Sequence, residues 1–223
     1  MDKRILAATL AMALLLPTIA TVAPVKATTY TIDPALTVTY RNPETFFEAA
    51  AVGTITLLPG DIVNVNPATY TNDPADFSMS FIVPPGVKLQ STRGRNVTFI
   101  QGTGGVDDGI VIGGNDVSII GFTLEFFGGS VISDGGTARS NCVISNNRIR
   151  SNFGGDAIDL SAGGDNNNQI LRNIVQDTAG NDGIVVAGNR NKINKNTVGN
   201  VPTGIQNNGI IVDGNNNTIA SNV

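Results

Sequence analysis

The 223-residue chain carries 14 basic and 18 acidic side chains, no histidine and one cysteine, and its formal net charge is −4. This length suits a single domain with its own core. The acidic balance, without a basic cluster, argues against a nucleic-acid partner. The lack of histidine removes imidazole acid/base chemistry and the commonest transition-metal ligand, and a lone cysteine excludes an intramolecular disulfide.

Residues 1–27 have the organisation of a secretory signal. Lys3 and Arg4 give a charged start, Ile5–Leu16 is a short apolar run, and Val25–Ala27 offers small residues for cleavage. The run is shorter than the roughly 20 residues that a spanning helix needs, and no second candidate follows. We therefore predict a secreted protein, extracellular or held at the cell envelope, without a transmembrane segment once the signal is removed. An uncleaved N-terminal anchor is the alternative.

The next segment, 28–79, is predicted to form an N-terminal cap and the opening strands. Within it, "RNPETFFEAAAVG" (41–53) is typical of a short helix. Asn42 suits the N-cap, Pro43 the first turn and Gly53 the C-terminal end. Such a helix would cover the open end of a repetitive fold.

From residue 80 to 223 the sequence repeats with a period of roughly 25 residues. Each unit holds three short apolar pairs, such as Ile184 and Val186, whose spacing places both side chains on one face of a strand. Strands this short need neighbours, which stacking supplies at about 4.8 Å per turn. The repeated apolar positions form three series: Ile110, Val131, Ile158, Ile184 and Ile210; Ile119, Ile144, Ile170, Ile193 and Ile219; and Leu124, Ile149, Val175 and Val198.

Asparagines keep register with the second apolar series. They stand three residues after its members, at Asn147, Asn173, Asn196 and Asn222, with Phe122 in the matching place of the first unit. Asn tolerates left-handed backbone angles, and stacked amides bond one another. We predict that these four residues form a structural ladder at one corner. A leucine-rich repeat is the rival, but Ile and Val replace Leu here and the connectors lack a helical pattern.

The segments "DGIVVAGNRNKINKNTV" and "NGIIVDGNNNTIASNV" resemble the right-handed parallel β-helix repeats of the pectate-lyase-like superfamily. The resemblance covers roughly residues 80–223 and predicts an all-β solenoid of parallel coils with the short N-terminal capping helix. The chain reaches Val223 inside a coil, so a longer protein or a covering partner is expected. Enzymes of this family use acidic residues in an outer-sheet groove, for calcium or for acid/base catalysis, often with Arg or Lys.

Two aspartates are the leading catalytic candidates. Asp156 and Asp159 lie in "GGDAIDLS", and Asp159 is predicted to point outward in mid-strand. Its outward neighbours in adjacent coils are expected to be Val111, Val185 and Ile211. That mostly apolar wall is unlike a sugar-acid groove and suggests contact with a loop or a partner.

Four further residues are candidate binding groups. Asp108 and Asp182 are predicted to begin strands equivalent to that of Asp156, where a bound Ca²⁺ would relieve carboxylate repulsion. Arg172 and Lys195, each two residues after a member of the second apolar series, would place positive charge on a different wall. The alternatives are ordinary turn chemistry for the aspartates and solvated surface charge for the basic residues.

The sequence leaves two functions open. The first is a structural or binding module at the cell envelope that meets polysaccharide or another surface protein. The second is a polysaccharide-degrading lyase or hydrolase centred on Asp156 and Asp159, with Ca²⁺ as a possible cofactor. Aromatic platforms for sugar rings are few, and Phe126, Phe127 and Phe153 are the candidates in coil loops.

Overall fold

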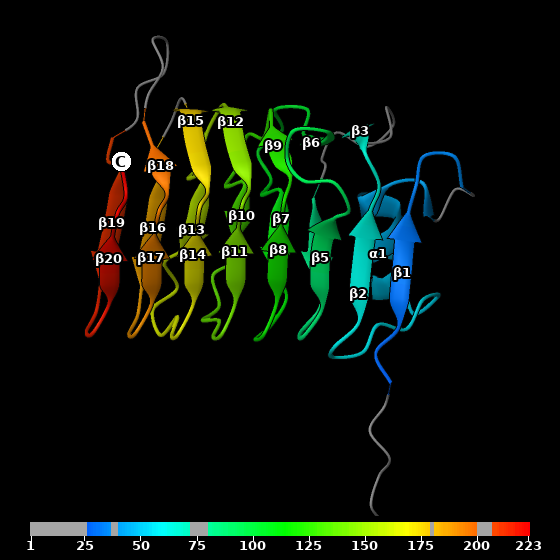
Figure 1. Ribbon diagram of the computed structural model, residues 1–223, viewed down its shortest axis with the longest axis horizontal. Helices are drawn as coiled ribbons and strands as arrows, with labels where there is room; N and C mark the ends of the chain where they lie inside the picture. Colours follow the sequence, from blue (N-terminus) through cyan, green and yellow to red (C-terminus); the bar gives the residue numbers. More distant parts are fainter. Residues whose placement is uncertain (1–25, 37–39, 72–79, 179–180, 200–206) are drawn as a thin grey trace, which may run out of the picture.

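The computed structural model describes residues 26–36, 40–71, 80–178, 181–199 and 207–223. They form a right-handed parallel β-helix in which three sheets run along one long axis. The coils follow one another from β1 and α1 at one end to β19 and β20 at the other (Figure 1). The fold class predicted from the repeats is therefore confirmed.

Each turn of the chain passes through three sheets in the same order, which we call sheets A, B and C. Sheet A contains β1 (Thr29–Ile32), β2 (Ile62–Val65), β5 (Lys88–Ser91), β8 (Ser118–Ile120), β11 (Val143–Ser145), β14 (Gln169–Leu171), β17 (Lys192–Asn194) and β20 (Thr218–Ala220). Sheet B contains β3 (Ala68–Thr71), β6 (Thr98–Gln101), β9 (Thr123–Glu125), β12 (Arg148–Asn152), β15 (Ile174–Thr178) and β18 (Thr197–Val198). Sheet C contains β4 (Phe81–Val83), β7 (Ile110–Ile112), β10 (Ile132–Ser133), β13 (Ile158–Leu160), β16 (Ile184–Ala187) and β19 (Ile210–Asp213).

The segments between sheets form three rows of corners. We call them the A–B corner (for example 146–147 and 172–173), the B–C corner (126–131 and 153–157) and the C–A corner (134–142 and 161–168). Parallel strands in one register place equivalent residues directly above one another. A side chain that suits a corner therefore recurs from turn to turn.

The apolar series become the columns of the core. The second series stacks in sheet A and the third in sheet B, as predicted. In sheet C one predicted member is wrong, because Ile132 rather than Val131 pairs with Ile110 and Ile158. Both Val131 and Ile132 are completely buried, so hydrophobicity alone does not separate the strand residue from its corner neighbour. The shift turns Ser133 to the outer face, beside Asp159.

The predicted helix is α1 (Pro43–Ala51), and it covers the N-terminal end of the coils. The backbone N–H of Glu44 donates to the side chain of Asn42 at 3.0 Å, which satisfies one of the free donors of the first turn. Phe47 stacks on Phe81 of β4 with 5.2 Å between ring centroids. The helix thereby shields the first strand of sheet C from water.

The predicted signal segment lies almost wholly outside the described residues, so export stays a prediction. Within the described ranges, no helix has both the length and the apolar character required to cross a membrane. At the far end of the coils the core opens to solvent, where Ile219 of β20 is 55% exposed.

Candidate functional site

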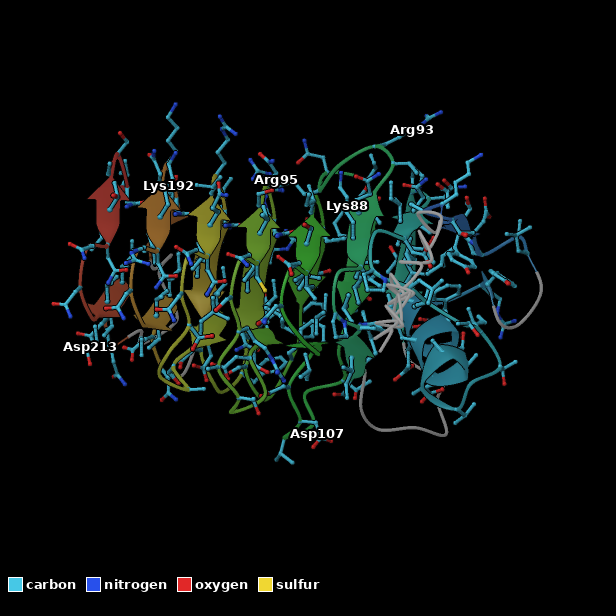
Figure 2. The ribbon with its side chains drawn as sticks, turned by 90° about the horizontal axis from the view of Figure 1, so that it is seen from below. Lys88, Arg93, Arg95, Asp107, Lys192 and Asp213 are labelled. Carbon is cyan, nitrogen blue, oxygen red and sulfur yellow. The ribbon has the colours of Figure 1, made fainter. Side chains whose placement is uncertain are left out.

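Charge is distributed unevenly around the coils. In Figure 2, Lys88, Arg93, Arg95 and Lys192 lie along one long side of the molecule, and Asp107 and Asp213 lie on the other. The acidic candidates from the sequence belong to sheet C and its corners, and the basic ones belong to the A–B corner. The two sides are described in turn, beginning with the groups that hold the corners together.

The four predicted ladder residues stand in one column at the A–B corner. The backbone N–H of Asn147 donates to Asn173 Oδ1 at 3.0 Å, that of Asn173 to Asn196 Oδ1 at 2.9 Å, and that of Asn196 to Asn222 Oδ1 at 2.9 Å. Phe122 begins the column by donating its N–H to Asn147. Asn147, Asn173 and Asn196 are fully buried. Each of these bonds therefore satisfies a backbone N–H that water cannot reach.

A second asparagine column lies at the C–A corner, and the sequence analysis did not predict it. The N–H of Cys142 donates to Asn168 Oδ1, that of Asn168 to Asn191 Oδ1, and that of Asn191 to Asn217 Oδ1, each at 2.8 Å. The available signal was register, because these asparagines stand two residues before the second apolar series. Cys142 takes the first place in the column, and burial raises the pKa of its thiol to about 11, so it is a packed, unreactive thiol.

The predicted acidic residues of the B–C corner form a third column. Ser130 N–H donates to Asp108 Oδ1 at 2.8 Å, Asp156 N–H to Ser130 Oγ at 3.2 Å, and Asp182 N–H to Asp156 Oδ1 at 2.7 Å. Asn208 N–H continues the column to Asp182 Oδ1 at 2.8 Å. The structure thus gives these carboxylates the same task that the asparagines perform elsewhere, and the sequence analysis missed Ser130.

Asp159 lies on the outer face of sheet C and is half-buried. Its partners in the adjacent coils are Ser133, which was not predicted, and Val185, which was; Val111 and Ile211 each lie one coil further along the sheet. Its Oδ1 accepts the N–H of Ser161 at 3.1 Å. The wall around Asp159 is therefore less apolar than predicted, but its carboxylate is also bonded to the backbone.

Burial raises the pKa of both catalytic candidates, Asp156 and Asp159. Neighbouring carboxylates add to the shift, with Asp108 acting on both and Asp134 on Asp159. Within the described ranges, no three Asp, Glu or Cys side chains gather in a way that would hold a metal ion. The predicted Ca²⁺ therefore has no such cluster to bind there.

A carboxyl pair that the sequence analysis missed lies at the C–A corner. Asp134 and Asp165 are buried, and Asp134 accepts backbone N–H groups from Gly136 at 2.7 Å and Ala162 at 2.8 Å. Asp165 Oδ1 accepts the N–H of Arg139 at 2.7 Å, while its buried Oδ2 has no hydrogen-bond partner among the described residues. Burial, together with the neighbouring Asp134, raises the pKa of Asp165 to about 6.

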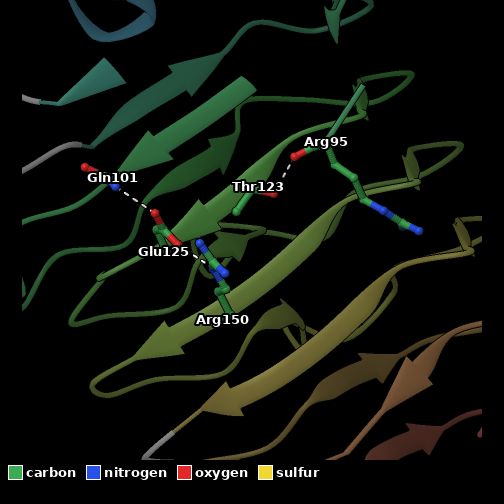
Figure 3. Close-up of polar contacts among 5 residues, drawn as sticks. All are labelled: Arg95, Gln101, Thr123, Glu125 and Arg150. Atoms are coloured by element: carbon green, nitrogen blue, oxygen red, sulfur yellow. Dashed lines mark hydrogen bonds and ion pairs between the residues drawn. The ribbon is translucent and has the colours of Figure 1, made fainter. Parts of the chain in front are cut away.

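The outer face of sheet B carries a polar triad. Glu125 is 3% exposed, accepts a hydrogen bond from Gln101 Nε2 at 2.7 Å and forms an ion pair with Arg150 Nε at 2.5 Å (Figure 3). The three residues share one register across β6, β9 and β12. The Arg150 side chain is 38% exposed, so part of this network reaches the surface.

Two aromatic rings extend this face where β9 and β12 end. Phe126 and Phe153 are stacked, with ring centroids 6.1 Å apart and planes inclined by 21°. They remain 36% and 60% exposed, whereas the adjacent Phe127 is buried. Phe126 adopts φ 66°, a left-handed conformation that costs a bulky residue about 1–2 kcal/mol.

At the A–B corner, Arg172 and Lys195 occupy left-handed positions with φ 57° and 59°. Gly121 and Asn146, which adopt this conformation more readily, hold the equivalent places in earlier turns. The structure thus brings the two predicted basic residues together in successive turns, away from Asp156 and Asp159. A hollow of about 690 Å³ at the C–A corner is lined mainly by Gly and Pro residues, with Asp116 and Arg139 as its charged members.

Neither a family model, nor a curated protein, nor a solved structure matches this chain. The β-helix architecture is shown by the strand pairing, while membership of the pectate-lyase-like superfamily stays a prediction. The function is therefore argued from the geometry of the faces described above.

Proposed function

We propose that this protein is a secreted or cell-surface β-helix module that binds polysaccharide on the outer face of sheet B. The observation that carries the proposal is the exposed stack of Phe126 and Phe153 beside the triad of Gln101, Glu125 and Arg150. A sugar ring has an apolar face that stacks on aromatic rings and hydroxyls that bond polar groups at its edge. The two halves of this site match those two properties.

The aromatic half is costly to maintain unless it has a partner. Two neighbouring rings stay exposed to water, although Phe127 beside them is buried. Phe126 also holds a strained backbone conformation, and strain of this kind concentrates at ligand sites. Both features are accounted for if the rings form a platform for a ligand.

The polar half is fixed before a ligand arrives. Glu125 is held from both sides by Gln101 and Arg150, so its carboxylate does not have to be ordered on binding. Arg150 uses its Nε for this pair and, being part-exposed, offers its remaining N–H groups to hydroxyls. A prearranged donor set next to an apolar platform favours binding with a defined orientation.

The resemblance of the repeats to the pectate-lyase-like superfamily supports a polysaccharide ligand, and the N-terminal segment supports location outside the cytoplasm. A binding role is favoured over cleavage because Asp156 and Asp159 each accept a backbone N–H on one carboxylate oxygen. Asp182 does so as well. The described carboxylates of sheet C therefore serve the fold, and a lyase or hydrolase is the alternative that the test must exclude.

The test is affinity electrophoresis and calorimetry of the purified protein against a panel of neutral and acidic polysaccharides. Phe153→Ala is expected to weaken binding about five- to tenfold, because it removes half of the platform. The matched control is Val106→Ala, which shortens an exposed apolar side chain in an earlier turn of the B–C corner, where Phe126 and Phe153 also lie. No binding across the panel, or equal binding by Phe153→Ala, would contradict the proposal.

The same samples are assayed for new reducing ends and unsaturated products. The proposal predicts none. Product formation that disappears in Asp159→Asn would establish the enzymatic alternative instead.

A further inference from the structure

The A–B corner collects cations on a protein that is acidic overall. Arg95, Arg148, Arg172, Lys192 and Lys195 come from four different turns and lie at this corner or on the strands beside it. Figure 2 shows Arg95 and Lys192 on the same side of the molecule, opposite Asp107 and Asp213. We call these five residues the basic strip.

No described carboxylate neutralises the basic strip. The ion pair that the described residues form joins Arg150 to Glu125, outside the strip. Burial lowers the pKa of Arg95, and the positive charge of Arg148 lowers it further. Arg172, Lys192 and Lys195 are exposed, so an oxyanion from solution can reach them and supply the missing negative charge.

Backbone contacts hold Arg95, at one end of the strip, in place. Arg95 Nη1 donates to the carbonyl of Arg172 at 2.9 Å and to that of Asn147 at 3.4 Å, which ties its guanidinium across successive turns. The hydroxyl of Thr123 donates to the carbonyl of Arg95 at 2.6 Å and fixes the loop that carries it (Figure 3). These contacts prearrange the positive charge of Arg95, which lowers the entropic cost of binding an anion there.

A hollow of about 160 Å³ lies within the strip. It is lined by Leu171, Arg172, Lys192, Asn194 and Lys195. A water molecule takes about 30 Å³, so the hollow has room for a charged group together with atoms of the ring that bears it. Asn194 Oδ1 is buried there without a hydrogen-bond partner in the described ranges and is suited to accept a hydrogen bond from a hydroxyl group.

We infer that the basic strip binds the anionic groups of an acidic polysaccharide, with Arg172 and Lys195 as its principal contacts. The two residues stand in successive turns, about 4.8 Å apart along the axis, so they meet charges that repeat along a polymer better than one small anion. The choice of polysaccharide rests on the function proposed for sheet B. The strip adds selection for carboxylate- or sulfate-bearing chains.

The experiment compares the purified protein on polygalacturonate and on its methyl-esterified, uncharged form. Arg172→Asn and Lys195→Asn are made singly and together, because Asn already occupies this left-handed position at Asn146 and preserves the corner. The matched control is Arg190→Asn, an exposed cation in the same conformation, φ 60°, at the C–A corner.

The double variant is expected to lose about tenfold in affinity for the acidic polymer and to bind the esterified polymer unchanged. The wild-type preference for the acidic form should shrink when salt is raised from about 50 to about 500 mM. Arg190→Asn should leave the preference intact.

Equal wild-type affinity for the two polymers, or an unaltered double variant, would overturn this inference while leaving polysaccharide binding in place. Absence of binding to both polymers and to the neutral panel would instead contradict the proposed function, and with it the ligand named here. Tighter binding to DNA than to polygalacturonate, abolished by the same double variant, would overturn the choice of polymer.

Discussion

The acidic side of the β-helix and its basic strip differ in what their charged groups already bond. On the acidic side, Asp108, Asp156 and Asp182 each accept a backbone N–H of the next turn on a carboxylate oxygen. At the A–B corner that task falls to neutral asparagines; Arg95 donates to two backbone carbonyls there, while Arg172 and Lys195 have exposed side chains. Charge that serves the fold is therefore separated from charge that is left for a ligand.

A substitution in the asparagine ladder at the A–B corner is expected to have the largest effect on stability. Asn173→Ala removes the acceptor of the buried N–H of Asn147 and the bond from Asn173 Nδ2 to the carbonyl of Ile144. We expect a loss of about 3 kcal/mol in the free energy of unfolding, since each unsatisfied buried group costs about 1–3 kcal/mol. Urea denaturation measures it.

The control for this change is Asn208→Ala, which deletes an exposed asparagine at the end of the acidic column. Its expected cost is below about 0.5 kcal/mol. Similar costs for the two substitutions would mean that burial does not set the value of a ladder position.

The carboxyl pair at the C–A corner predicts a dependence of stability on pH. Asp165 has a folded-state pKa of about 6 against an ordinary value of 3.8, so the folded protein holds more protons than the unfolded chain between these values. Stability should therefore fall as pH rises from about 4 to about 6, by at most about 3 kcal/mol from this group. Asp156 and Asp159 shift in the same direction.

Thermal unfolding of wild type and Asp165→Asn between about pH 4 and pH 7 tests the sign. The variant keeps an oxygen for the N–H of Arg139 and gains a donor that can bond Asp134, so it should be more stable near neutrality and show a flatter profile. A wild-type stability that increases with pH across this window would contradict the assignment.

A smaller effect separates the structural from the catalytic interpretation of Asp156. Asp156→Asn retains the acceptor for the N–H of Asp182 and removes a carboxylate whose pKa burial raises, so stability near pH 7 should stay equal or rise slightly. Asp156→Ala should lose about 1 kcal/mol with the hydrogen bond. Equilibrium unfolding of the pair gives the comparison, and equal losses would show that the acceptor is unimportant.

The parts of this fold that recur in register were predictable. The buried Ile and Val columns and the ladder of Asn147 and Asn173 keep a fixed offset from one another, so one-dimensional spacing was sufficient. The method failed at Val131 and Ile132, where two adjacent buried residues gave no alternation to choose between. Because that choice moved Ser133, it also altered the predicted surroundings of Asp159.

The candidate binding face was only partly visible in the sequence. Phe126 and Phe153 were named as aromatic candidates, but nothing in the sequence pairs Glu125 with Arg150, which stands 25 residues later in the next turn. Their contact depends on the register of β9 with β12, and corner lengths vary between turns. For the same reason, the gathering of cations at one corner was hidden by the overall acidic charge.

Radical footprinting of the protein with and without polygalacturonate tests the central claim most directly, because it reports which face the polymer covers. The account predicts that Phe126 and Phe153 lose reactivity on binding, while Tyr30 of sheet A, outside the proposed contact, and the surroundings of Asp159 on sheet C keep theirs. Protection centred on sheet C, with Phe126 and Phe153 unchanged, would contradict it and would place the ligand near Asp156 and Asp159.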